Sequence, residues 1–221
     1  GGMFAGAKVF NQDLSDWNIS EATNMGSMFN NATSLSSANK AVIHYAFKSN
    51  PNWTTDWSSY VGSTPLTDSN FQTAVNLWFS DEANAIATYG HISDWNVSAV
   101  TNMANAFQNR TSFNEDISRW DVSNVADVRW MFKNAASFNR DIHDWNTSKL
   151  SKMHAMFEGA ASFNQPIGTW DVTSVKDMSY MFYGAVVFNQ SIGDWNTTAV
   201  TNMGQMFRDA RVFNQDIGDW D

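Results

Sequence analysis

Large apolar residues recur along this chain at a fixed interval of 25 residues. One column consists of Trp17, near the start, and then of Trp95, Trp120, Trp145, Trp170, Trp195 and Trp220. A second column is Phe113, Phe138, Phe163, Phe188 and Phe213, and a third is Phe107, Phe132, Phe157, Phe182 and Phe207. A constant interval of this length indicates stacked repeats, in which each repeat buries its apolar side only against its neighbours. We predict that these aromatic columns form the core.

Within one repeat the pattern predicts a short helix followed by an extended segment. Apolar residues occupy the i, i+3, i+4 and i+7 positions of one helical face, as in Met203, Met206, Phe207 and Ala210. A Ser or Thr just before this run would cap the helix. The rest of the repeat places its apolar residues among Gly, Ser and Asp, and we expect it to be extended, with neighbouring segments about 4.8 Å apart.

The repeat register breaks between Trp17 and Trp95, which are separated by 78 residues. Two helical stretches are predicted in this interval. The first follows a cap at Ser36 or Ser37 and ends before Asn50-Pro51, and the second runs from Thr67-Asp68 to Gly90 with a break near Ser80.

Solenoid ends require caps, because a terminal repeat would otherwise expose its apolar side. We therefore expect residues 1–60 to hold the end of a first repeat array with a C-terminal helical cap. Residues 61–65 are then a linker, and residues 66–221 an N-terminal helical cap with a second array. One continuous solenoid with a long inserted loop is the alternative. Both ends of the chain lie inside a repeat, which favours a section of a longer tandem protein.

An Asn follows the column Phe in every complete repeat. These residues are Asn11, Asn114, Asn139, Asn164, Asn189 and Asn214. In a stack they would form a ladder that satisfies backbone groups in the turns. A ligand site would vary between repeats, whereas a structural ladder should not, so we interpret the series as structural.

At these residues the sequence resembles a known family. Residues 213–221 read Phe-Asn-Gln-Asp-Ile-Gly-Asp-Trp-Asp, and other repeats continue with Met-x-x-Met-Phe-x-x-Ala. The pattern is similar to the BspA-like repeats of bacterial and protist surface proteins, which are placed with the leucine-rich repeats. The resemblance implies an α/β solenoid of right-handed, leucine-rich-repeat-like coils, with a short strand and a short helix in each and helical caps. It also implies an extracellular or cell-surface location and no catalytic residues. Ala106, Arg110 and Val128 depart from the pattern.

Composition narrows the possible chemistry. The formal charge is −9 and no basic stripe is visible, so we do not expect the protein to bind nucleic acid. The absence of Cys excludes disulfides, thiol nucleophiles and Cys-based metal sites. No stretch is apolar enough for a membrane span. No nucleophile elbow or phosphate-binding loop occurs, so we expect no enzyme and no cofactor.

Aromatic and acidic residues each allow a functional and a structural interpretation. Trp columns could stack on sugars, but their repeat phase favours core packing. Trp53, Trp57 and Trp130 break the repeat and are better candidates for exposed contacts, although the first two could pack a cap. Acidic residues recur beside the column Trp and could hold Ca²⁺, yet a solvated acidic edge is favoured. The four His residues, His44, His91, His143 and His154, share no metal-ligand spacing.

Seven Asn-x-Ser/Thr sequons are possible glycosylation sites: Asn31, Asn52, Asn109, Asn18, Asn96, Asn146 and Asn196. The last four follow the column Trp, where other repeats carry Asp. That position could therefore simply favour a turn-forming Asn or Asp.

Two functions remain. We expect an extracellular structural repeat protein of a surface layer, filament or stalk, whose partners are other copies or neighbouring repeat domains. The alternative is a cell-surface adhesion module that binds a host protein or glycan.

Overall fold

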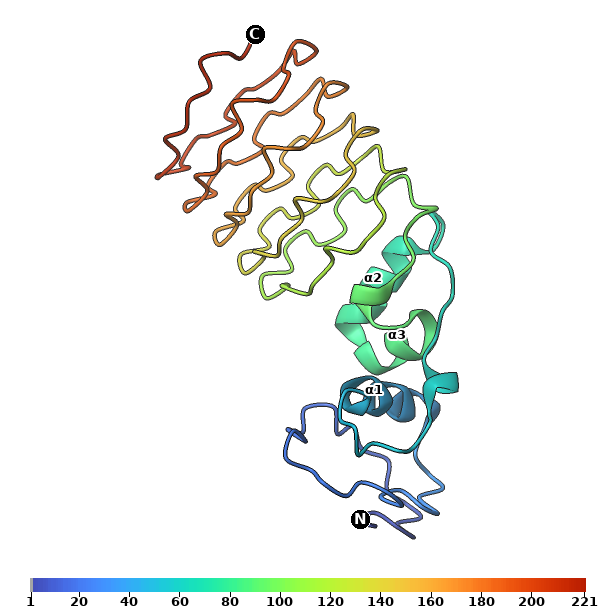
Figure 1. Cartoon of the computed structure of the whole chain (residues 1–221). Helices are drawn as coiled ribbons and strands as arrows, with labels where there is room; N and C mark the ends of the chain where they lie inside the picture. The colour runs from blue at the N-terminus through green and yellow to red at the C-terminus, as the bar shows by residue number, and fades with distance from the viewer. Residues whose placement is uncertain (1) are drawn as a thin grey trace. The chain divides into compact units, whose positions relative to one another are not determined.

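A computed structural model describes residues 2–221 (Figure 1). Its helices are α1 (Ser37–Phe47), η1 (Ser58–Tyr60), α2 (Phe71–Ser80), α3 (Glu82–Tyr89) and η2 (Ile92–Asp94), where η marks a 3₁₀-helix. In the described part of the chain no helix is long and apolar enough to cross a membrane.

The helices form where sequence signals start and stop them. The Ser36 side chain accepts a hydrogen bond from the Asn39 amide and so begins α1. Asp81 caps α3 in the same way, and Gly90 ends it at a φ of 83°. Both helical stretches predicted outside the repeats are therefore present.

The chain divides into two compact units. The first contains the residues up to Thr64 together with Asn76–Ile92, and the second contains Pro65–Val75 and Ser93–Asp221. The second predicted helical stretch is thus shared between the two units. The expected boundary at residues 61–65 and the capping role of the helices remain predictions.

The expected α/β solenoid is wrong. Residues 2–221 contain no β-strand and no sheet, and parallel pairing is limited to isolated bridges such as Asn102 with Asp127 and Asp177 with Asn202. Within the described residues, no repeat contains a helix. The leucine-rich-repeat-like description, with one strand and one helix in each repeat, is wrong for the same reason.

What the second unit has instead is a stack of turn-rich coils. We define coils 1 to 5 as the five 25-residue segments that begin at Trp95, Trp120, Trp145, Trp170 and Trp195. Figure 1 shows them from green to red as successive coils lying side by side. The first unit contains the same kind of turn around Phe4 and Phe29.

Backbone hydrogen bonds explain why the coils are neither helical nor stranded. Alternate amides of coil 4 donate to carbonyls of coil 5 at 2.9–3.0 Å, and the pairs are Met178 to Asn202, Tyr180 to Gly204, Phe182 to Met206 and Gly184 to Arg208. The intervening amides, as at Met181 and Ala185, donate to the carbonyl three residues back in their own coil. In a helix all of these amides would donate to carbonyls of the same coil, and in a strand all of the paired amides would donate to a neighbouring strand.

Left-handed residues make this alternation possible. Two columns have φ between 52° and 67°, and they are Ser27, Asn105, Trp130, Ala155, Tyr180 and Gln205, then Asn31, Asn109, Asn134, Gly159, Gly184 and Asp209. A left-handed residue every few positions reverses the chain and interrupts an α-helix. The apolar positions were nevertheless predicted correctly, because Met178, Met181, Phe182 and Ala185 are fully buried.

Aromatic stacking fills the inside of the coils. Ring centroids lie 5.5–5.8 Å apart along the column from Phe107 to Phe207, and 5.7–6.0 Å apart from Phe113 to Phe213. Each fully buried Phe contributes roughly 1.5–3 kcal/mol through burial of its apolar surface. The stack is therefore held by backbone hydrogen bonds and by its aromatic interior together.

The left-handed requirement can be tested at Gly184. A Cβ atom there would meet no atom closer than 3.9 Å, so at the Cβ the left-handed backbone conformation, and not lack of space, resists substitution. We expect Gly184→Val to lower the free energy of unfolding by about 2 kcal/mol, because β-branched residues strongly disfavour positive φ. Gly184→Asn, the residue of two other coils, should cost less than about 1 kcal/mol. Urea unfolding measures both.

A helical repeat would give a different result. Asn and Val have similar helix propensities, and both exceed that of Gly. Equal stability of the two variants, or a gain in both, would therefore contradict the left-handed turn.

Candidate ligand-binding face

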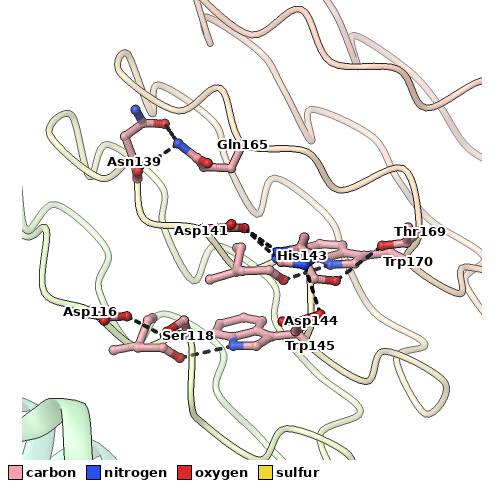
Figure 2. Close-up of polar contacts among 12 residues, drawn as sticks. Asp116, Ser118, Asn139, Asp141, His143, Asp144, Trp145, Gln165, Thr169 and Trp170 are labelled. Carbon is pink, nitrogen blue, oxygen red and sulfur yellow. Dashed lines mark hydrogen bonds and ion pairs between the residues drawn. The ribbon is translucent and has the colours of Figure 1, made fainter.

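Asn and Gln side chains form a ladder from coil to coil, and Figure 2 shows one of its contacts, between Asn139 and Gln165. The Asn oxygen of each coil accepts the amide of the Asn 25 residues later, in the pairs Asn114–Asn139, Asn139–Asn164, Asn164–Asn189 and Asn189–Asn214, at 2.8–3.0 Å. Gln165, Gln190 and Gln215 add a second bond from their side-chain amides to the same oxygens. The Asn oxygens are therefore occupied by backbone amides and Gln side chains of the next coil. In the first unit, Asn11 accepts from Ser36, next to α1.

The Trp column lies in the interior of the second unit. Trp145, Trp170 and Trp195 are 3–5% exposed, and each indole N–H donates to the carbonyl of the Ile 28 residues earlier. Figure 2 shows two of these bonds. Such rings offer no face for a sugar. Trp17 differs, since it is 40% exposed in the first unit.

The remaining unusual Trp residues divide into two groups. Trp53 and Trp57 pack on the core of the first unit around Phe29 and Phe47, and the Trp53 indole lies 3.2 Å from Nδ1 of His44. Trp130, in contrast, is only half-buried and holds a left-handed conformation.

The sequons after the column Trp form local turns. The side-chain oxygens of Asn96, Asn146 and Asn196 each accept the amide and the hydroxyl of the Ser or Thr two residues later. Asp121 and Asp171 occupy the same turns in the other coils. Of the other sequons, Asn31 and Asn109 are exposed and left-handed, whereas Asn52 is half-buried. Glycosylation remains a prediction.

The acidic edge contains one histidine clamp. His143 contacts Asp141 through Nδ1 and Asp144 through Nε2, both at 2.9 Å (Figure 2). The hydrogen bond with Asp141, assisted by both negative charges, raises the His143 pKa. Across residues 2–221, no group of three or more His, Asp or Glu side chains could hold a metal ion.

When the coils are aligned by their repeat positions, one segment differs in sequence between the central and the outer coils. The outer coils carry Thr-Asn-Met-Ala-Asn at residues 101–105 and Thr-Asn-Met-Gly-Gln at 201–205. The three central coils replace these residues with Ala-Asp-Val-Arg-Trp, Ser-Lys-Met-His-Ala and Lys-Asp-Met-Ser-Tyr at residues 126–130, 151–155 and 176–180. We call these three segments the central face.

A shallow groove of about 400 Å³ crosses the central face. It is lined by Arg129, Ser151, Lys152, His154, Ser174, Lys176 and Asp177. Three permanent cations meet here although the chain as a whole carries a charge of −9. The concentration of positive charge is therefore local.

A buried carboxylate holds one of these cations in place. Asp127 is 4% exposed and binds Nε and Nη2 of Arg129 at 2.7–3.2 Å, while the Lys152 ammonium lies 3.5 Å away. Burial by itself would raise the Asp127 pKa, but the hydrogen bonds and charge of Arg129 and the charge of Lys152 outweigh it and lower that pKa. The guanidinium is consequently fixed before any ligand arrives.

His154 is oriented by a different pair. Its Nδ1 lies 2.7 Å from the Ser179 hydroxyl, which in turn lies 2.5 Å from the Asp177 carboxylate. A nucleophilic site needs the histidine between the serine and the acid. Here the buried Ser179 stands in the middle, so the chain of bonds positions the His154 ring and does not activate a nucleophile.

Two aromatic rings contact His154, which lines the groove, although neither ring lines the groove itself. The His154 ring lies 5.2 Å from that of Trp130 and 5.8 Å from that of Tyr180, which is 39% exposed. The Arg129 guanidinium lies 5.4 Å from the Trp130 ring. Cations, hydroxyls and partly exposed aromatic rings thus share one surface, as they do in many ligand sites.

A comparison with protein families assigns the chain. A family model described as "Mycoplasma protein of unknown function, DUF285" matches residues 1–60, 73–186 and 141–221. The chain belongs to the DUF285 family. No curated protein matches it. No solved structure matches it either.

Sequence reasoning missed most of the central face of this DUF285 chain. It selected Trp130 because that residue breaks the repeat, but it treated His154 only as a possible metal ligand. Arg129, Lys152 and Lys176 lie 23 and 24 residues apart, so no basic run appears. Aligning the repeats and asking where the central ones differ from the outer ones would have revealed the cluster.

The Asn ladder makes a testable contribution to stability. Asn164→Ala removes the acceptor of the Asn189 amide and of the Gln190 side chain, and we expect a loss of about 1–2 kcal/mol in urea unfolding. Asn146→Ala, which affects only an exposed turn within one coil, should cost less than about 0.5 kcal/mol. Equal losses would mean that the ladder adds nothing between coils.

The His143 clamp predicts a pH effect with a definite sign. A raised folded-state pKa stabilises the fold fully below the unfolded value of about 6.5, and the contribution fades as the pH rises through the raised value. NMR titration should give a His143 pKa above about 6.5, and Asp141→Asn should lower it. Asp194→Asn, the same charge change in coil 4, should leave it unchanged. A wild-type value at or below 6.5 would contradict the clamp.

Proposed function

We propose that this DUF285 chain is a non-catalytic repeat scaffold at the cell surface whose central face binds a ligand. The observation that carries the proposal is the contrast between constant and variable positions. Inward-facing residues repeat in nearly every coil, whereas cations and aromatic rings replace the outer-coil residues only in coils 2 to 4. Packing alone does not require that difference, because coils 1 and 5 stack without it.

The surface location rests on resemblance. The Phe-Asn-x-x-Ile-x-x-Trp and Met-x-x-Met-Phe patterns are similar to BspA-like repeats, which occur in bacterial and protist surface proteins. The seven sequons and the lack of Cys are compatible with an extracellular protein. A surface protein that adheres to a host molecule is one function consistent with the central face.

A structural role in a surface layer, filament or stalk is the second candidate. It is favoured by the regular spacing of the coils, since each one presents the same backbone donors and aromatic rings to the next. Such stacking produces a stiff element whose length grows with the number of repeats.

Binding is tested by returning the central face to the residues of the outer coils. The reverted variant carries Trp130→Asn, Lys152→Asn, His154→Ala, Lys176→Thr and Tyr180→Gln. We expect the wild-type chain to bind at least one member of a glycan array or an array of extracellular-matrix proteins, and the reverted variant to bind it at least about tenfold more weakly. The matched control is Arg140→Gln, because Gln occupies that column in coils 3 to 5.

Two results would contradict the binding function. One is equal binding by the reverted variant and the wild type. The other is no binding by the wild-type chain to either array.

Assembly is tested separately by sedimentation. A structural role predicts association between copies that increases with concentration. A chain that is still monomeric at about 100 µM associates with less than about 5.5 kcal/mol, which would exclude an autonomous structural assembly.

A further inference from the structure

The central groove contains several kinds of binding group that a single class of ligand could contact at the same time. Arg129, Lys152 and Lys176 come from three successive coils and line the same groove. Within residues 2–221, the Lys176 ammonium forms no ion pair, so its charge is available. An anionic group in the groove would meet positive charge from every coil that it crosses.

Arg129 is prepared for such a group. Asp127 binds its Nε and Nη2, and no described residue accepts a hydrogen bond from Nη1. Because Asp127 is buried and the Arg129 side chain is 38% exposed, the carboxylate supports the guanidinium from below. A fixed guanidinium loses less side-chain entropy on binding than a free one.

The groove is not uniformly basic, which constrains the ligand. Asp177 lines it with a side chain that is 47% exposed, beside the hydroxyls of Ser151 and Ser174. A carboxylate would repel the closely spaced phosphates of a nucleic acid or the charges of an acidic peptide. A ligand with both hydroxyls and an acidic group could donate to Asp177 and still contact the cations.

The aromatic rings complete the set. Trp130 and Tyr180 are partly exposed on either side of His154, and each ring has an apolar face next to a polar edge. Sugar rings present apolar C–H faces together with hydroxyl groups. A groove of about 400 Å³ is also within the range of small-molecule sites.

We propose that the central groove binds an acidic sugar unit of a glycan, with its carboxylate or sulfate on Arg129, Lys152 and Lys176 and its ring against Trp130 or Tyr180. This inference rests on the proposed binding function and specifies its ligand class.

Calorimetry with oligosaccharides of matched length tests the ligand class. The probes are a heparin tetrasaccharide, its desulfated and N-acetylated form, whose only charges are carboxylates, and neutral N-acetylated chitotetraose. We expect at least one acidic tetrasaccharide to bind about tenfold more tightly than chitotetraose, and its affinity to fall with added salt. If the desulfated form binds, the cations of the groove recognise carboxylates. If desulfation abolishes binding, they recognise sulfate.

Two further probes separate sugar recognition from charge alone. An eight-nucleotide oligo-dT and a ten-residue polyglutamate carry negative charge without a sugar acid of this type. If either binds as tightly as the better tetrasaccharide, the inference is overturned. Equal affinity for chitotetraose also overturns it, while leaving the proposed binding function intact. If no acidic tetrasaccharide binds while a matrix protein does, only the ligand class fails.

Single substitutions assign the two halves of the site. Lys176→Thr should weaken acidic-sugar binding about tenfold and reduce its salt dependence. Trp130→Asn should weaken binding by a similar factor without changing the salt dependence. Both substitutions introduce the residue that an outer coil carries at the corresponding position. The control, Arg140→Gln, should leave binding unchanged. Urea unfolding of each variant confirms that the coils remain folded, and unchanged binding in both folded variants would overturn the assignment.

Discussion

The second unit depends on how each coil divides its backbone amides. Alternate amides reach the next coil and the others close turns within their own coil, as at Phe182 and Ala185. Neither set would suffice, because unpaired amides in a buried backbone cost free energy. The division works only if two residues in each coil adopt positive φ, and Gly159, Gly184 and several Asn residues meet that need at low cost.

These hydrogen bonds set the spacing between coils, and that spacing determines which side chains contact each other. Rings that are 25 residues apart lie about 6 Å apart and stack, and the Trp170 indole N–H donates to the carbonyl of Ile142, which lies just before the preceding Trp of the column. On the edge, Asn oxygens accept the amides that the turns leave open. The same three devices serve every interface between coils 2 and 5. Coils can therefore be added without a new packing solution.

Positions outside these columns are free to vary. At the central face, the outer coils carry short polar residues, while the inner coils carry Arg129, Lys152, His154 and Lys176. Without Arg129 the buried Asp127 would lose its hydrogen-bonded cation and keep only Lys152 at 3.5 Å, so the carboxylate and the guanidinium support each other. The central face is thus an addition to a scaffold that does not need it, which is why we assign the binding function to it.

The sequence alone determined the repeat length, the buried positions, the helices outside the repeats and the residues of the Asn ladder. These features follow from periodicity and from local signals such as the Ser36 cap, and both can be recognised from the order of the residues. The local conformation was not determined in this way. Residues at i, i+3, i+4 and i+7 are buried by a helix and equally by consecutive turns, and only contacts with the next coil select the turns.

The central face was hidden for a related reason. Arg129, Lys152 and Lys176 are distant along the chain, and it is the stacking of coils that brings them to one groove. The pairing of Asp127 with Arg129, and of His154 with Ser179, likewise exists only in the folded chain. Sequence periodicity specifies which residues face inward, whereas the lateral neighbours of outward-facing residues are set by the register between coils, which only the tertiary structure decides.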